Sequence, residues 1–122
     1  MMDWNLVRPV VAQVLRRQTY TNSGQYHGER CFISPYQIAV LVDRINPALK
    51  GSLPVGGEGT GPDSFARRIA WHLSDDYNQN AFNGSLEIQV FSCEGLDGNR
   101  KGFLFDGGNV PSPEEFSIFR LV

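Results

Sequence analysis

With 122 residues, the chain has the usual length of one domain and can bury a single hydrophobic core. Its composition of 41% apolar and 20% charged residues excludes an intrinsically disordered chain, and no apolar run approaches the roughly 18 residues that span a bilayer. The formal net charge of −2 argues against a general polyanion binder, because such proteins are strongly basic. We therefore expect one folded domain over residues 1–122 with no membrane partner.

The first residues and the cysteines bear on where the protein works. The start Met1–Asn5 lacks the basic and apolar regions of a signal peptide, which favours the cytoplasm. Cys31 and Cys93 lie far apart, with no Cys-x-x-Cys spacing and no histidine cluster. We expect two reduced, unlinked thiols, no structural metal and no cofactor.

The first predicted element is a helix between Asp3 and Arg17. Apolar residues recur at steps of three and four and form one face, namely Trp4, Val7, Val11 and Val14. Asp3 can cap the start, but Pro9 lacks a backbone donor, so we expect the regular helix to begin near Pro9. The polar residues 19–28 predict a loop, and residues 30–33 have room for one short strand.

The second helix has the strongest start signal in the chain. Ser34-Pro35-Tyr36-Gln37 is a capping box with proline at the first helical position. Beyond the cap, one apolar stripe is expected to face the core, formed by Ile38, Leu41, Val42 and Ile45. Asn46-Pro47 is predicted to end the helix.

A glycine-rich connection over residues 47–61 leads to Pro62-Asp63 and a third helix, expected to run through about Ser74. Its predicted core side consists of Phe65, Ala66, Ile69, Ala70, Leu73 and Tyr77. Its predicted outward side consists of Ser64, Arg67, Arg68 and Trp71. The glycines of residues 56–61 form either a structural loop or an anion site at the start of this helix. The structural loop is favoured, because no Gly-Lys-Ser/Thr follows and Glu58 adds negative charge.

The remainder of the chain is predicted to be mainly β-structure. Leu86–Val90 alternates between apolar and polar residues, and Phe103–Phe105 is a second short strand, so the two predict a hairpin. Its long tip carries Arg100 and Lys101. The segment Phe116–Val122 reads as an extended strand with two largely apolar faces. One protomer can hardly cover both faces, so we expect a homodimer or larger assembly through this segment.

The order helix, short strand, helix, helix, strand, loop, strand over residues 3–106 resembles winged-helix domains, with residues 107–122 as a C-terminal extension. The resemblance implies an α+β fold of three helices and a small antiparallel sheet. Residues 34–39 (SPYQIA), 54–61 (PVGGEGTG) and 64–70 (SFARRIA) also resemble small uncharacterised bacterial proteins, some encoded in integron gene cassettes on mobile genetic elements. That resemblance implies no agreed activity. The long connection between the second and third helices and the apolar C-terminal strand depart from the winged-helix pattern.

The winged-helix resemblance makes the third helix the recognition element and the hairpin tip a wing. Six residues are the candidate nucleic-acid contacts: Ser64, Arg67, Arg68, Trp71, Arg100 and Lys101. Arg16 and Arg17 could add backbone contacts. Residues 1–72 hold eight Lys/Arg against five Asp/Glu, so this half can approach an anion, whereas residues 73–122 hold three against eight. The alternative is an ordinary solvated face, with Trp71 covered by the C-terminal strand or a partner subunit.

Two hypotheses for function follow. The leading one is a winged-helix-like nucleic-acid-binding or regulatory protein with double-stranded DNA as partner. The alternative is a non-enzymatic protein-interaction or oligomerisation module. An enzyme is not expected, because His27 and His72 have no nucleophile at motif spacing and Asp75-Asp76 reads as two solvated carboxylates at a helix end.

Overall fold

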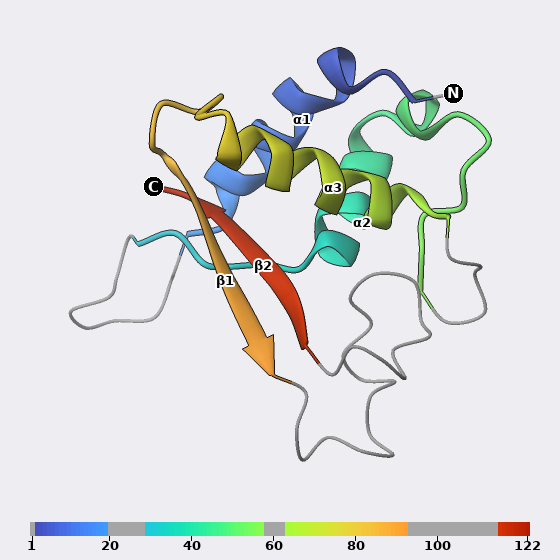
Figure 1. The fold of residues 1–122 in the computed structure, drawn as a ribbon. Helices are drawn as coiled ribbons and strands as arrows, with labels where there is room; N and C mark the ends of the chain where they lie inside the picture. The colour runs from blue at the N-terminus through green and yellow to red at the C-terminus, as the bar shows by residue number, and fades with distance from the viewer. Residues whose placement is uncertain (1, 20–28, 58–62, 93–114) are drawn as a thin grey trace.

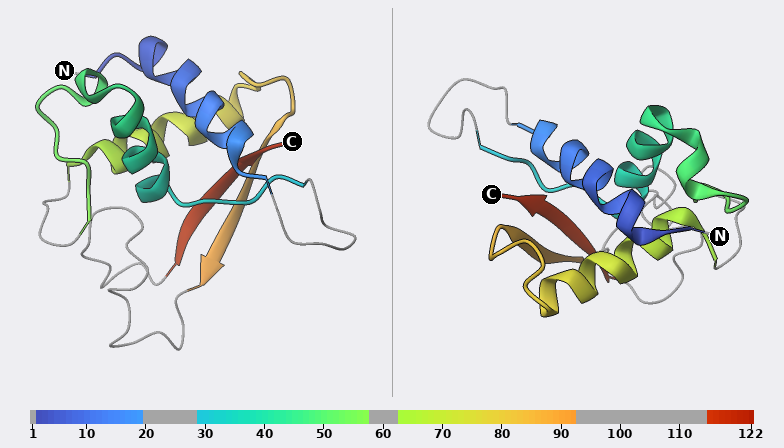
Figure 2. Two further views of the ribbon diagram at one scale, coloured as in Figure 1. Left: turned by 180° about the vertical axis from the view of Figure 1, so that it is seen from behind. Right: turned by 90° about the horizontal axis from the view of Figure 1, so that it is seen from above.

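The computed structural model describes residues 2–19, 29–57, 63–92 and 115–122. Three helices lie on one side of a two-stranded antiparallel sheet (Figures 1 and 2), which confirms the predicted α+β class; they are α1 (Trp4–Arg17), α2 (Pro35–Ile45) and α3 (Phe65–Asn78). One apolar core joins all three helices and both strands. No helix in these four segments has the length and apolar character needed to cross a bilayer.

Helix α1 starts at Trp4, well before Pro9, so the expected delay of the helix is wrong. Two contacts stabilise the first turn of α1. Asp3 caps it by accepting a hydrogen bond from the Asn5 backbone N–H at 3.0 Å, and the Trp4 indole is buried against α3. Proline removes only one backbone donor, and these contacts offset that loss.

Helix α2 begins as predicted. The Gln37 backbone N–H donates to the Ser34 hydroxyl at 3.2 Å, and the Gln37 side chain accepts from the Ser34 backbone N–H at 2.8 Å, which completes the capping box. Ile38 and Val42 are fully buried, as expected for the apolar stripe. Ile45 is 40% exposed, so its assignment to the core stripe is wrong, because the helix ends at this residue.

Helix α3 runs one turn beyond Ser74. Four residues of its predicted core side are fully buried, namely Phe65, Ala66, Ile69 and Leu73. Tyr77 is 52% exposed, so its assignment to the core is wrong. Asp76 takes the core side of the last turn instead and is only 3% exposed. The helical period explains this, because residue 76 lies seven positions after Ile69 and three after Leu73.

The sheet pairs strand β1 (Leu86–Ser92) with strand β2 (Glu115–Leu121) over seven residues, from Leu86 opposite Leu121 to Ser92 opposite Glu115. The C-terminal segment is therefore the partner of β1. The predicted strand at 103–105 lies outside the described residues. The predicted strand at 30–33 is reduced to single bridges, of which the one at Ile33 exchanges two hydrogen bonds with Phe119 at 2.9 and 3.0 Å. Strand β2 thus lies between Ile33 and β1.

Strand β2 completes the core. Phe119 is fully buried and Leu121 is 2% exposed, whereas Arg120 points to the other face and pairs with Glu87 of β1. Phe119 and Leu121 of the C-terminal segment are therefore part of the core that the helices share. One apolar face of this segment is covered within the protomer, whereas the expectation of an assembly concerned both faces. The homodimer itself stays a prediction.

Candidate nucleic-acid interface

The outward side of α3 carries one exposed candidate residue, Trp71, and the half-buried Arg67. Trp71 is 64% exposed, and Arg67 lies one helical turn before it on the same side, opposite the buried residues Ile69 and Leu73. Asp75 is exposed one turn after Trp71. We name Arg67, Trp71 and Asp75 the outer stripe of α3. The helical period therefore predicted correctly which side of α3 faces solvent at Trp71.

Ser64 does not belong to this surface, which corrects its predicted outward placement. It is fully buried and caps α3, because its hydroxyl accepts a hydrogen bond from the Arg67 backbone N–H at 3.2 Å. A capping side chain turns back over the first turn of its helix, away from any ligand in front of it. The signal was present in the sequence, since a serine directly before the first apolar residue, Phe65, is a common helix start.

Arg68 is held in an ion pair on the protein itself. Its guanidinium donates two parallel hydrogen bonds to the Asp63 carboxylate, at 2.8 Å from Nε and 3.0 Å from Nη2. This pairing lowers the pKa of Asp63 and raises that of Arg68, in both cases chiefly through the hydrogen bonds between the two side chains. A phosphate that contacts Arg68 must therefore compete with Asp63.

The first three backbone N–H groups of α3 already have hydrogen-bond partners. The backbone N–H groups of Phe65 and Ala66 donate to the carbonyls of Pro54 and Val55 at 2.8 and 3.0 Å, and the next N–H is capped by Ser64. A helix start binds phosphate only when such groups point at the ligand. Pro54 and Val55 therefore satisfy the start of α3. The choice between a structural loop and an anion site for the glycines of residues 56–61 stays a prediction, because residues 58–61 lie outside the described residues.

Other predicted contacts lie elsewhere. Arg16 and Arg17 are exposed in the last turn of α1. Arg100 and Lys101, the predicted wing contacts, lie outside the described residues. The structure therefore brings Arg67, Arg68 and Trp71 together on one helix surface and leaves the contribution of the wing a prediction.

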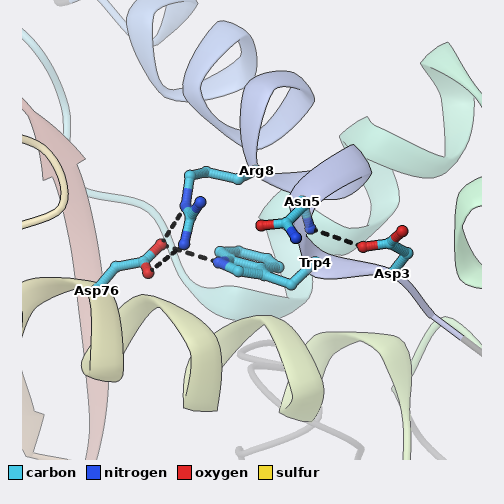
Figure 3. A network of polar contacts seen from close by, with 5 residues as sticks. All are labelled: Asp3, Trp4, Asn5, Arg8 and Asp76. Carbon is cyan, nitrogen blue, oxygen red and sulfur yellow. Dashed lines mark hydrogen bonds and ion pairs between the residues drawn. The ribbon is translucent and has the colours of Figure 1, made fainter.

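A buried polar cluster was missed by the sequence reasoning (Figure 3). The Asp76 carboxylate accepts hydrogen bonds from Nε and Nη2 of Arg8 at 2.8 and 2.7 Å and from the Trp4 indole N–H at 2.9 Å. His72 stacks on the Trp4 ring with the ring centres 4.9 Å apart. The pairing raises the pKa of Arg8, chiefly through its hydrogen bonds to Asp76. The expectation that Asp76 is solvated is wrong. The sequence did contain a signal for its burial, because the helical period places residue 76 on the core side of α3.

This cluster is a structural clamp. It joins the first turns of α1 to the last turns of α3, and the Asp76 carboxylate accepts hydrogen bonds from three donors.

Within the described residues, no group of three or more His, Cys, Asp or Glu side chains is placed to hold a metal ion. Cys31 is a half-buried free thiol. Cys93 and His27 lie outside the described residues.

The outer stripe projects from the convex surface of a helix. A hollow of about 570 Å³ lies between the end of α3 and β1, and it is lined by Tyr77, Asn80 and Gln89 among others, but not by Arg67 or Trp71. Small-molecule sites are concave and enclose most of their ligand. A protruding tryptophan beside an arginine is better suited to a macromolecular ligand.

Comparison with protein-family models, with curated proteins and with solved structures found no match for this chain.

Proposed function

We propose that the protein is a winged-helix-like nucleic-acid-binding protein and that α3 is its recognition helix. The observation that carries this proposal is the outer stripe, where Trp71 is 64% exposed one turn after Arg67. Tryptophan and arginine are among the side chains that most often anchor contacts between macromolecules. Arg67 would contact a phosphate or a base edge, and the indole would contact sugar, a thymine methyl group or a base.

The arrangement of the elements supports the same function. Three helices lie on one side of the sheet, and β2 lies between the bridge at Ile33 and β1. In the winged-helix pattern, a short early strand joins the sheet in this way, the third helix contacts nucleic acid, and the connection between the last two strands forms a wing. Arg100 and Lys101 lie in that connection. We propose that they contact the phosphate backbone.

Arg67→Ala tests this function most directly. The variant should bind a labelled DNA duplex more weakly. Its melting temperature should fall only slightly, because Arg67 is half-buried but lies opposite the buried residues Ile69 and Leu73. Loss of one phosphate contact lowers the slope of log affinity against log salt by about one. The matched control is Arg44→Ala, which removes an exposed arginine from the end of α2. The measurement is fluorescence anisotropy at several salt concentrations.

Equal losses from the two arginine variants would assign the effect to net charge and remove the role of α3. If the wild type binds neither duplex nor single-stranded DNA at about 50 mM salt, where non-specific contacts register, nucleic-acid binding is wrong.

A second candidate, a protein-interaction module, is favoured by the charge of this surface. Asp63 neutralises Arg68, and Asp75 is exposed on the same stripe as Arg67, so the α3 face is close to neutral. Exposed aromatic and arginine side chains on a nearly neutral surface are typical of contacts between proteins. If this candidate holds, Trp71→Ala lowers the mass measured by light scattering, whereas Arg67→Ala leaves it unchanged.

A further inference from the structure

Charge is distributed unevenly along the outer stripe. Arg67 lies at the N-terminal end, Trp71 in the middle and Asp75 at the C-terminal end, each one helical turn from the next. Arg68 adds positive charge only at the N-terminal end, and there it shares that charge with Asp63. A ligand with a phosphate backbone is therefore attracted at one end of the stripe and repelled at the other.

This layout is poorly suited to a helix lying along an intact duplex groove. The major groove of B-DNA is about 12 Å wide, so an inserted helix has a row of phosphates along each flank. Asp75, one turn beyond Trp71, would then approach one of these rows. A single strand has one backbone and can cross the helix near Arg67 alone.

The chemistry of Trp71 also favours a single strand over an intact duplex. The indole has one hydrogen-bond donor and no acceptor, so it distinguishes base edges poorly. Its large ring face gains most from stacking, and proteins that bind single strands use exposed aromatic rings in this way. Within a perfect duplex, away from its two ends, both faces of each base are covered by neighbouring bases. Along the strand, an unpaired base is therefore what offers a free face to Trp71.

We propose that Trp71 stacks on an unpaired base of a nucleic-acid strand whose backbone crosses the Arg67 end of α3. The proposal rests on the nucleic-acid-binding function and names the form of the ligand. The buried, stacked environment of Trp4 leaves Trp71 as the exposed one of the two indoles, so a stacked base would quench the fluorescence of Trp71.

The test compares three DNA probes of one sequence: a single strand of about 15 nucleotides, its perfect duplex, and the duplex with one unpaired nucleotide. The full chain should bind the single strand and the bulged duplex roughly tenfold more tightly than the perfect duplex, and both should quench its tryptophan fluorescence. Trp71→Ala should abolish this preference, and Trp71→Phe should retain part of it. The matched control is Tyr77→Ala, which removes an exposed aromatic ring of α3 outside the stripe and should keep the preference.

A charge variant tests the path of the backbone. Asp75→Asn should strengthen binding of the perfect duplex more than binding of the single strand, because only the duplex must place phosphates near this carboxylate. Perfect-duplex binding as tight as single-strand binding, or a preference that survives in Trp71→Ala, overturns the stacking proposal and leaves the nucleic-acid-binding function standing. Binding to none of the three probes overturns both.

Discussion

At the scale of single residues, one buried carboxylate connects two helices that are distant in sequence. Asp76 accepts hydrogen bonds from Trp4 and Arg8, and the contact with Trp4 spans 72 positions. A charge is tolerated in the interior only when it is paired and hydrogen-bonded, and Asp76 meets both conditions. The clamp fixes the C-terminal end of α3. That end also carries Asp75, the acidic residue of the outer stripe.

Asp76→Asn should destabilise the fold by about 2–3 kcal/mol. The amide carries no charge for Arg8 and can accept at only one of its two atoms, so one donor of the cluster loses its partner. Arg8 is partly exposed, and water can solvate it, which keeps the loss below that of a fully buried pair. Urea unfolding followed by circular dichroism measures the change.

The control for this prediction is Asp75→Asn at the neighbouring exposed position, which should change the stability by less than about 0.5 kcal/mol. Similar unfolding midpoints for the two variants would mean that the clamp contributes nothing.

At the scale of elements, the long connection between α2 and α3 is packed against the protein at residues 54–57. Pro54 and Val55 supply the carbonyls that satisfy the start of α3, and Gly56 and Gly57 follow with φ values of +131° and +96°. A Cβ on Gly57 would lie 3.0 Å from Cε1 of Tyr36 in α2. Glycine is needed here both for its backbone conformation and for the close approach.

Gly57→Ala should therefore be more destabilising than Gly84→Ala. Gly84 also has a positive φ, +83°, but a Cβ there would meet nothing within 4 Å. Alanine at residue 84 carries only the backbone strain, about 1 kcal/mol, while alanine at residue 57 adds a clash that costs roughly 1 kcal/mol more. Thermal unfolding of both variants checks the order, and equal losses would show that the contact with Tyr36 is unimportant.

At the scale of the whole molecule, the last strand closes the core. Phe119 pairs with Ile33 on one side and Ile88 on the other, and its ring is fully buried. The contact between the helices and the sheet therefore depends on strand β2. This placement gives the C-terminal segment a role in folding whether or not the protein forms a dimer.

Phe119→Ala should destabilise the protein by about 3–5 kcal/mol, which is a large fraction of the roughly 5–15 kcal/mol by which domains are stable. Val122→Ala is the control, because Val122 is 73% exposed and its truncation should change little. Thermal unfolding reports the stability, and sedimentation of the same samples reports the mass. A stable Phe119→Ala protein with a reduced mass would contradict the core role and support the segment as an assembly contact.

The sequence by itself determined the features that depend on residues within a turn or two of each other. The capping box at Ser34, the end of α2, the buried face of α3 through Leu73 and the exposure of Trp71 all follow from the spacing of neighbouring side chains. The α+β class follows from the order of these local signals. For the candidate site, the spacing of side chains along α3 was sufficient to identify which side of the helix faces solvent.

Only the tertiary structure decided what depends on partners far away in the chain. The pairing of β1 with β2, the burial of Asp76 against Arg8 and the capping of α3 by Pro54 and Val55 each join separate segments. Periodicity shows which side of an element is apolar, but not which segment covers it. The early start of α1 has the same cause, since the contact of Trp4 with Asp76 offsets the local cost of Pro9.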